Sequence, residues 1–211
     1  VGAGPGVTYA SDGATHHAVQ DLSIMRALPG FEIYNPSDSL SASAVAKLSY
    51  RAINPVYVRL NKGKLPSLYD ASENFQQGLS LIKKGQKILL ISTGIMVHRA
   101  MELAKELSKE RLNPSIIDLY RIKPLNKDLL VSYIKQHDCV VSLEEHSLVG
   151  GIGSALSEVI TDEQLDVSLK RFGLNDIYCP KYGSREWMQA YYGLDVQSIM
   201  KNILSWMNKM E

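Results

Sequence analysis

Along most of the chain, short apolar runs alternate with stretches in which apolar residues recur every three or four positions. Continuous apolar runs are typical of strands buried on both faces, and the wider spacing is typical of amphipathic helices. The sequence predicts strands at residues 31–34, 55–60, 88–92, 115–119, 139–143 and 167–171. It predicts helices at residues 14–28, 42–50, 96–110, 126–136, 152–160 and 196–207. This alternation indicates an α/β fold with a mostly parallel sheet covered by helices.

Residues 61–74 interrupt the alternation. They are rich in Lys, Gly, Pro, Ser and Asp and lack apolar periodicity, which is typical of an interdomain linker. We therefore expect two domains, residues 1–70 and residues 71–211. In the second domain, the last predicted helix carries Ile199, Ile203 and Trp206 on one stripe and should pack back on the domain.

The composition is that of a folded globular protein. Hydrophobic residues make up 45% of the chain and charged residues 21%, and the formal net charge of +1 provides no broad field for nucleic acid or an anionic membrane. No apolar run approaches the roughly 20 residues that span a bilayer. Nothing resembles a signal peptide, and Val1 has the character of an interior residue of a longer chain. We expect a soluble, cytoplasmic protein that binds neither nucleic acid nor membrane.

The two cysteines, Cys139 and Cys179, lie far apart in the sequence and outside any CxxC pair. We expect both to be reduced residues that pack in the interior.

The densest polar cluster is Asp12-Gly13-Ala14-Thr15-His16-His17, just before the first predicted helix. A loop that leads into a helix presents side chains and free N–H groups, so this cluster could hold a substrate phosphate or hydroxyl. Simple capping explains the same residues, with Thr15 as the cap and Asp12 closing the turn. The spacing alone leaves both interpretations open.

Two basic residues, Arg59 and Lys62, flank the end of the strand predicted at residues 55–60. Ligands collect at such strand ends in open α/β sheets, so either residue could reach an anion. The alternative is a pair of solvated charges.

Glu144-Glu145-His146 follows another predicted strand and precedes a Gly-Gly-x-Gly segment. Two carboxylates beside an imidazole could form an acid–base site or half of a metal site. Because no second ligand cluster appears, we interpret the charges as a subunit contact and the glycines as close helix–strand packing, and we predict no metal site. His98 and His137 are expected to be solvated on helix faces.

Segments along essentially the whole chain resemble transketolases. SDGATHHAVQDLSIMRALPGFEIYNPSD resembles the substrate-side segment of their pyrimidine-binding domain. PVYVRLNKGKLP, DLYRIKPLN, SLEEHSLVGGIGSALSEV and YGSREWMQAYYGLD resemble the rest of that domain and the C-terminal domain of the family, in the same order. The resemblance implies a partial thiamine pyrimidine-binding domain at residues 1–70, without its N-terminal half, and a transketolase C-terminal-type α/β domain at residues 71–211.

The resemblance also implies an activity. Transketolases use thiamine diphosphate and Mg²⁺ to transfer a two-carbon ketol unit from a ketose phosphate to an aldose phosphate, as in the pentose phosphate pathway. The glutamate that activates thiamine and the motif that binds the diphosphate and Mg²⁺ belong to regions absent from this chain. We therefore expect a component that is inactive alone and works as a homodimer, or as a heterotetramer with an N-terminal diphosphate-binding subunit.

By the same resemblance, Asp12 should bind a sugar hydroxyl near the reacting carbon, and His16 should donate to substrate oxygens. His17 should shape the same pocket, and Lys62 should bind the substrate phosphate. From its place at the strand end, we also expect Arg59 to bind substrate. Lys62 stands where the family usually has an arginine for the phosphate, so it keeps the charge and loses the bidentate fork.

The sequence also departs from the family pattern. Gly4 stands where transketolases commonly carry a phosphate-contacting histidine, and Ala14 replaces a usual proline. Deoxyxylulose-phosphate synthase and the β subunits of 2-oxo acid dehydrogenases share the layout. Two alternatives to a transketolase component therefore remain, a fragment of deoxyxylulose-phosphate synthase and a non-catalytic assembly or regulatory subunit.

Overall fold

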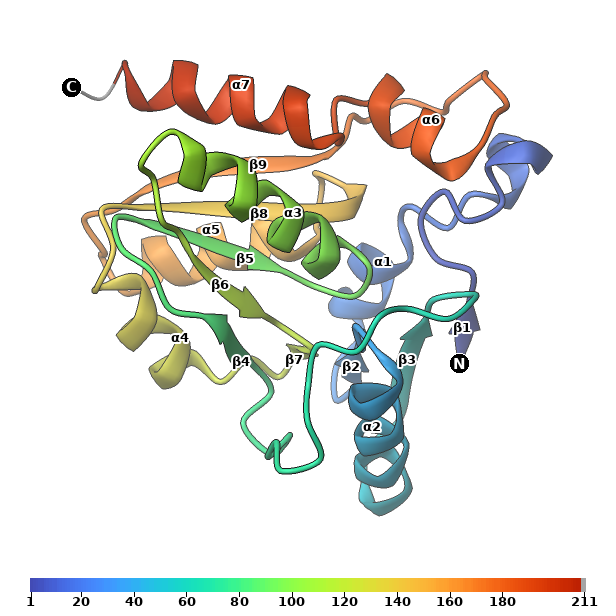
Figure 1. The fold of residues 1–211 in the computed structure, drawn as a ribbon. Helices are drawn as coiled ribbons and strands as arrows, with labels where there is room; N and C mark the ends of the chain where they lie inside the picture. Colours follow the sequence, from blue (N-terminus) through green and yellow to red (C-terminus); the bar gives the residue numbers. More distant parts are fainter. Residues whose placement is uncertain (210–211) are drawn as a thin grey trace.

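The computed structural model describes residues 1–209, which form two neighbouring sheets with helices on their faces (Figure 1). The strands are β1 (Gly2–Ala3), β2 (Glu32–Tyr34), β3 (Val56–Leu60), β4 (Ser80–Lys83), β5 (Ile88–Ser92), β6 (Ser115–Asp118), β7 (Arg121–Lys123), β8 (Cys139–Ser147) and β9 (Ser168–Leu174). The helices are α1 (Asp21–Ala27), α2 (Ser39–Arg51), α3 (Met96–Lys109), α4 (Lys127–Ile134), α5 (Ile152–Asp162), α6 (Arg185–Tyr191) and α7 (Val196–Met207). Two 3₁₀ turns, η1 (Ala10–Asp12) and η2 (Ala14–His16), precede α1.

The larger sheet has the strand order β4-β6-β5-β8-β9. β5 pairs in parallel with β6 and β8, β8 pairs in parallel with β9, and only β4 at the edge runs antiparallel to its neighbour β6. Every residue of the central strands β5 and β8 is buried, as expected for strands covered on both faces. The predicted α/β fold with a mostly parallel sheet is confirmed.

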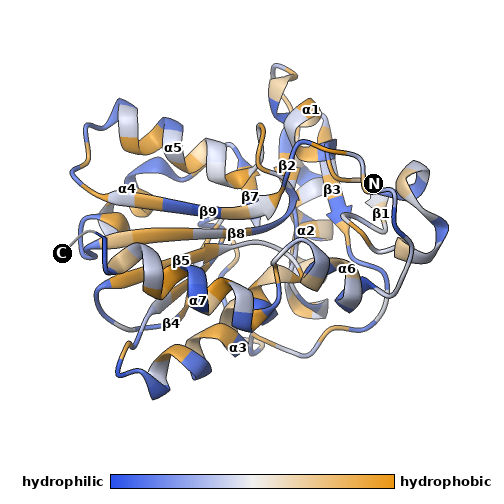
Figure 2. Ribbon diagram, turned by 90° about the horizontal axis from the view of Figure 1, so that it is seen from above, coloured by the Kyte–Doolittle hydropathy of each residue, from blue (hydrophilic) through white to orange (hydrophobic). Residues whose placement is uncertain are grey.

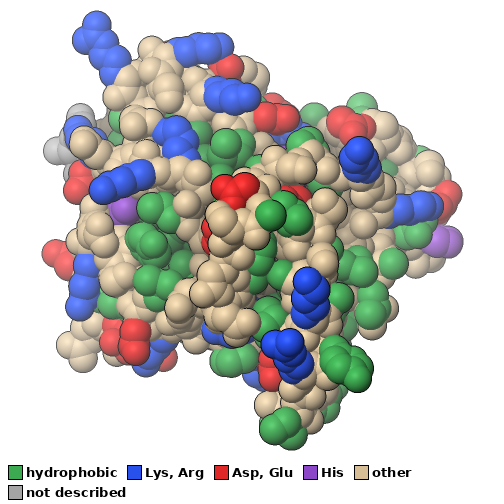
Figure 3. Space-filling model, turned by 60° about the horizontal axis from the view of Figure 1, so that its bottom comes forward, with side chains coloured by type: hydrophobic (Ala, Val, Ile, Leu, Met, Phe, Trp, Pro, Cys, Tyr) green, Lys and Arg blue, Asp and Glu red, His purple; other side chains and the backbone are tan. Residues whose placement is uncertain are grey.

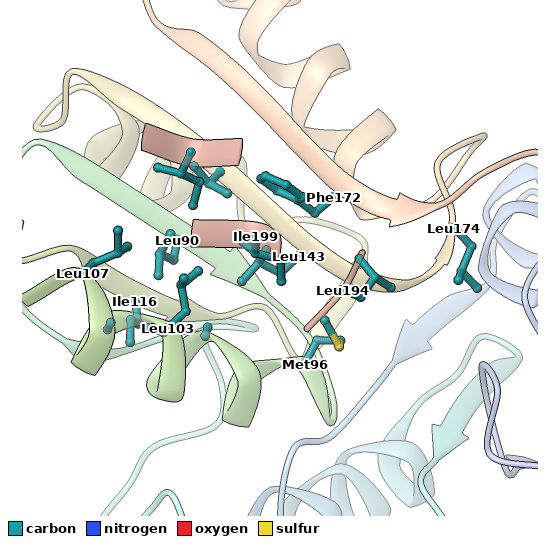
Figure 4. Packing of buried hydrophobic residues seen from close by; sticks show 14 of the residues in the cluster. Leu90, Met96, Leu103, Leu107, Ile116, Leu143, Phe172, Leu174, Leu194 and Ile199 are labelled. Atoms are coloured by element: carbon teal, nitrogen blue, oxygen red, sulfur yellow. The ribbon is translucent and has the colours of Figure 1, made fainter. Parts of the chain in front are cut away.

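Helices cover both faces of this sheet. On one face, apolar residues of α3 and α7 pack on β5, β6 and β8, and Figure 4 shows Leu103 of α3, Leu90 of β5, Leu143 of β8 and Ile199 of α7 pointing toward one another. On the other face, α4 and α5 pack on the same strands, of which β5 and β8 are largely orange in Figure 2. Burial of these aliphatic side chains stabilises the fold by about 2 kcal/mol each.

The smaller sheet has the order β1-β3-β2-β7 and combines both halves of the chain. β7, from the second half, pairs antiparallel with β2, with Ile33 opposite Lys123 and Tyr34 opposite Arg121. α2 packs on one face of this sheet through Val45, and the fully buried Leu22 of α1 fills the space between the sheet and the second half. Both halves therefore contribute to one sheet, and a domain boundary at residue 70 stays a prediction.

The first helix differs from the prediction. It was expected at residues 14–28, with Thr15 as its cap, whereas α1 begins at Asp21. Gly13 has a φ of 83°, which interrupts helical geometry, and Gly6 and Ala18 form an antiparallel bridge that keeps the chain between them in a loop. The interpretation of Thr15 as a helix cap is therefore wrong.

Other features follow the sequence closely. α7 occupies the predicted residues, with Ile199 and Ile203 fully buried, and Cys139 and Cys179 are free and buried. Within residues 1–209, no helix has the length and apolar character needed to cross a membrane. On the face shown in Figure 3, Lys and Arg side chains lie dispersed among acidic ones.

Candidate functional site

Residues 7–17 form a loop, here called the 7–17 loop, that lies beside α6 at one end of the molecule (Figure 1). Its base is closed by two backbone hydrogen bonds, from Gly6 N to Ala18 O at 2.9 Å and from Ala18 N to Gly6 O at 3.0 Å. Val7 and Ala10 are almost completely buried and join the apolar core of the second half. The loop is thus anchored from within while its outer side faces solvent.

Asp12 and His16 occupy that outer side and are both exposed. Thr15 Oγ1 lies 3.0 Å from His16 Nδ1, so Nε2 is the ring nitrogen that can meet an incoming ligand. The ring of Tyr182 lies so close to Gly13 that an added Cβ would come within 2.5 Å of it. The loop therefore displays a carboxylate and an imidazole outward, which are groups able to bind hydroxyl and phosphate oxygens.

His17 lies one step inward and is half-buried. Its Nε2 is buried and lacks a hydrogen-bond partner among the described residues. Burial lowers the pKa of His17, the nearby Glu145 carboxylate opposes that shift, and His16 adds to it. His17 is therefore a neutral imidazole at pH 7, suited to lining a pocket.

Lys62 joins the 7–17 loop through an aromatic contact. Its Nζ lies 4.8 Å from the centroid of the Tyr9 ring, within range of a cation–π interaction. Lys62 is exposed and lies two residues after the end of β3, whose last carbonyl, at Leu60, accepts from Gly4 N at 3.0 Å. The ammonium group thus lies over the same loop that carries Asp12 and His16.

Arg59 is engaged inside the protein. Its Nε donates to Asp21 Oδ2 at 2.8 Å, and its Nη2 donates to Asp21 Oδ1 at 3.2 Å and to the carbonyls of Ala18 and Glu145. Tyr57 OH donates to the same Asp21 carboxylate at 2.9 Å. The side chain of Arg59 is only 5% exposed. This geometry favours a structural role, and substrate binding by Arg59 stays a prediction.

The interpretation of Glu144, Glu145 and His146 as a subunit contact is wrong, because all three are buried within this chain. Glu144 accepts from Ile152 N at 2.8 Å and from Gly153 N at 2.9 Å, so it caps the start of α5. Burial raises the pKa of Glu144 to about 7, against the effect of these two hydrogen bonds.

The glycines after these residues do provide the expected close packing. A Cβ added at Gly151 would lie 1.9 Å from Glu144 Oε2, so the cap requires glycine at that position.

The buried histidine is held neutral. His146 Nδ1 lies 2.7 Å from Ser147 O, and Ser23 N donates to Nε2, which fixes the proton on Nδ1. Burial and, to a smaller extent, the positive charge of Arg59 lower the pKa of His146 to about 4, against the effect of the hydrogen bond to Ser147 and of the Asp21 charge.

The histidines expected to be solvated are instead half-buried and hydrogen-bonded. His98 Nε2 lies 2.7 Å from Ser37 O, and His137 contacts Tyr133 O and Ser115 Oγ.

Four residues near the site were missed from the sequence: Asn61, Tyr182, Arg185 and Gln189. Arg185 donates to both oxygens of Glu145 and, through Nη1, to Asn61 Oδ1 at 2.9 Å. Gln189 Nε2 also donates to Glu145. The segment YGSREW, with its clustered aromatic and basic residues, was the signal that could have indicated Tyr182 and Arg185.

A second buried polar cluster lies where the halves meet at the carboxyl end of β6. Ser37 Oγ donates to Asp118 Oδ2, and Tyr69 OH donates to the same oxygen at 2.6 Å. Asp38 caps α2 and accepts from Leu68 N at 2.9 Å. A loop of the first half, the linker and a strand of the second half therefore converge on Asp118.

A cavity of about 130 Å³ opens at the carboxyl ends of β2 and β3. Its lining includes Leu60, Asn61, Lys64 and Asp38. Among residues 1–209, no group of three or more His, Cys, Asp or Glu side chains is arranged to hold a metal ion.

Comparison with known proteins identifies the family. The model of the transketolase C-terminal domain matches residues 78–199, and that of the transketolase pyrimidine-binding domain matches residues 2–67. The chain belongs to the transketolase family.

Individual relatives agree with this assignment. The chain is 30% identical over 205 residues to a subunit of the apulose-4-phosphate transketolase of Actinobacillus succinogenes, covering 97% of this chain and 66% of that protein. It is 34% identical over 196 residues to 1-deoxy-D-xylulose-5-phosphate synthase of Caldanaerobacter subterraneus, covering 92% of this chain and 31% of that protein. A split-gene transketolase solved as an inactive beta4 tetramer superimposes with a TM-score of 0.86 at 30% identity, covering 97% of this chain and 64% of that one. The chain thus spans less than two thirds of the subunit-type relatives.

Transketolases use thiamine diphosphate, but the described residues do not fit the whole cofactor. The cavity at the ends of β2 and β3 is small, and no acidic cluster within residues 1–209 could hold the metal ion of a diphosphate. Residues 1–209 therefore do not form a complete site for the cofactor and its metal ion.

Proposed function

We propose that this chain is a component of a thiamine diphosphate- and Mg²⁺-dependent transketolase, which transfers a two-carbon ketol unit from a ketose phosphate to an aldose phosphate. It works in the cytoplasm, in the pentose phosphate pathway or a related sugar pathway. The assembly is a homodimer, or a heterotetramer with an N-terminal subunit that binds the diphosphate and Mg²⁺.

The observation that carries this proposal is the outward display of Asp12 and His16 on a loop anchored in the core of the second half. A ligand can reach both groups only from the solvent side, where another polypeptide can complete the site. The split transketolases among the relatives support the same division of labour.

The chemistry of each of these side chains determines the role that we assign to it. The Asp12 carboxylate accepts a hydrogen bond from a sugar hydroxyl, and His16 Nε2 donates to a substrate oxygen. Lys62, held over Tyr9, binds the substrate phosphate as a point charge. His17, neutral and half-buried, forms the wall between these groups.

Kinetics of the reconstituted complex would test these roles. Asp12→Ala and His16→Ala should each lower kcat/KM for a ketose phosphate by on the order of 10²-fold, because each removes a polar contact to the reacting part of the sugar. Asp166→Ala is the matched control, since Asp166 is exposed on a loop of the second half outside the site. Unchanged kinetics in both site variants, with the fold intact by circular dichroism, would contradict the assignment.

Deoxyxylulose-phosphate synthase activity is the second candidate, favoured by the 34% identity to one such enzyme. A coupled assay with pentose phosphates and a parallel assay with pyruvate and glyceraldehyde phosphate separate the two. Turnover only with pyruvate would replace the transketolase proposal by the synthase. A complex that binds the partner subunit and turns over neither set would indicate a non-catalytic assembly subunit.

A further inference from the structure

Glu145 is a buried carboxylate that directly contacts the beginning of the 7–17 loop. Its Oε1 accepts from Val7 N at 2.8 Å and from Arg185 Nη2 at 2.8 Å, and its Oε2 accepts from Arg185 Nε at 3.1 Å and from Gln189 Nε2. The Glu145 side chain is 1% exposed and that of Arg185 is 13% exposed. A charge with so little water around it depends on these donors, so the atoms that contact it are held in fixed positions.

The chain around Val7 is shaped to reach this carboxylate. Gly6 has a φ of 63°, and a Cβ at that position would lie 2.2 Å from Glu145 Oε1. Only glycine provides both the left-handed conformation and the space at this point. The approach of the 7–17 loop to Glu145 is therefore specified by the sequence of the loop itself.

Arg185 extends the contact to the second substrate-binding segment. While Nε and Nη2 face Glu145, Nη1 donates to Asn61 Oδ1 at 2.9 Å, and Asn61 immediately precedes Lys62. One planar guanidinium thus connects the segment that carries Lys62 to the carboxylate that holds the base of the loop with Asp12 and His16. Lysine could not make this connection, because a single ammonium cannot span both acceptors with the geometry of a fork.

The two halves of the chain do not need this contact merely to stay together. They are already joined by pairing of β2 with β7 and by Arg26, which donates to Gly150 O at 2.7 Å and to Glu158 at 2.5 Å. Those contacts lie away from the 7–17 loop. The Glu145–Arg185 pair differs because, besides Gln189 of α6, it contacts Val7 N and Asn61 Oδ1, which belong to segments that carry candidate substrate groups.

We propose that Glu145 and Arg185 are positioning residues through which the second half of the chain sets the distance between Lys62 and the Asp12–His16 pair. The inference rests on the proposed function, since it assigns Lys62 to the phosphate and Asp12 and His16 to the reacting end of the sugar. Selectivity for a phosphorylated sugar of a given length is then determined partly by Glu145 and Arg185 of the second half.

Kinetics of the reconstituted complex test the effect on substrate. Arg185→Lys should raise KM for a ketose phosphate about tenfold and change KM for a non-phosphorylated ketol donor less than about twofold, because only the former uses Lys62. Glu145→Gln should lower kcat for both donors about tenfold, because the base of the 7–17 loop is released. Arg26→Lys is the matched control, since Arg26 also connects the two halves with its side chain only 16% exposed.

Hydrogen–deuterium exchange of the same complexes tests the positioning without relying on activity. Arg185→Lys and Glu145→Gln should accelerate amide exchange in peptides covering residues 7–18 and 61–65, including the Val7 amide, while Arg26→Lys leaves these peptides unchanged. If Glu145→Gln does not fold, the exchange of Arg185→Lys alone tests the proposal, because this variant keeps the positive charge beside Glu145.

The outcomes separate the two proposals. Unchanged exchange in both peptides, the same acceleration in Arg26→Lys, or equal KM changes for phosphorylated and non-phosphorylated donors would overturn the positioning role. A wild-type complex that turns over no ketose phosphate would refute the proposed function instead, and the exchange comparison would then decide whether the pair holds the two segments.

Discussion

Asp118→Asn tests whether the buried carboxyl group of Asp118, where three segments meet, makes the stability of the protein depend on pH. Asp118 is 0% exposed, and its Oδ1 has no hydrogen-bond partner within the described residues. Burial raises the pKa of Asp118 to about 7, hydrogen bonds from Ser37 and Tyr69 oppose the shift, and the charges of Asp38 and Glu73 add to it. The folded protein therefore holds this proton more tightly than the unfolded chain does.

The pKa difference sets the size of the effect on stability. In the unfolded chain Asp118 has its ordinary pKa of 3.8, so the proton contributes stability that is fully present below pH 3.8. That contribution is lost as the pH rises through 7. At about 1.4 kcal/mol per unit, the whole loss is about 4 kcal/mol, and about 3 kcal/mol of it falls between pH 5 and pH 9.

Urea unfolding at pH 5 and pH 9 measures this loss. Between these two values, the free energy of unfolding of the wild type should fall by about 3 kcal/mol more than that of Asp118→Asn, because the amide has the same shape and cannot ionise. Asp166→Asn, which alters an exposed carboxylate, should follow the wild type. If Asp118→Asn and the wild type show the same pH dependence, Asp118 does not titrate in this range and the reasoning from its burial is refuted.

Two further substitutions test the contacts around the site by urea unfolding. Arg59→Leu should lower the free energy of unfolding by about 3 kcal/mol, because it leaves the largely buried Asp21 carboxylate without its cation, and a loss below about 1 kcal/mol would show that the ion pair is not needed. Gly6→Ala should lower the free energy of unfolding by more than Gly30→Ala, which should lower it by only about 1 kcal/mol. Both glycines have positive φ, but only at Gly6 would the new Cβ collide with Glu145. Equal losses in the two variants would contradict the close contact.

The second half of the chain could be predicted well because its signals are local. β5 is a short apolar run and α7 is an amphipathic stretch, so each shows its structure within its own residues. β7 could not be predicted in this way, because its three residues become a strand only by pairing with β2, about 90 residues earlier in the sequence.

The first helix shows how local patterns mislead. Residues 14–28 have helical spacing of apolar residues, yet Ile24 is 62% exposed and Leu28 39% exposed, and Leu22 alone is fully buried. Conformation before Asp21 is decided by Gly13 and by the bridge between Gly6 and Ala18, which depend on long-range packing of the loop.

The candidate site was predicted only in its exposed part. Asp12, His16 and Lys62 stand in motifs that resemble a family, and the structure leaves them accessible. The contacts that hold the loop with Asp12 and His16 could not be predicted, because the Val7 amide and the Glu145 carboxylate that accepts from it are separated by 138 residues. Contacts at such separations carry no periodic signal in the sequence.

The pairing of β7 with β2 has a consequence for any exchange of parts between related proteins. A recombinant made by joining residues 1–70 of one relative to residues 71–211 of another would bring a foreign edge strand to the smaller sheet. Such a chimera must match the side chains opposite Ile33 and Tyr34 as well as the linker. The sheet of the first half thus depends on the three residues of β7, which lie in the second half of the chain. We therefore expect the two halves to change together among related proteins.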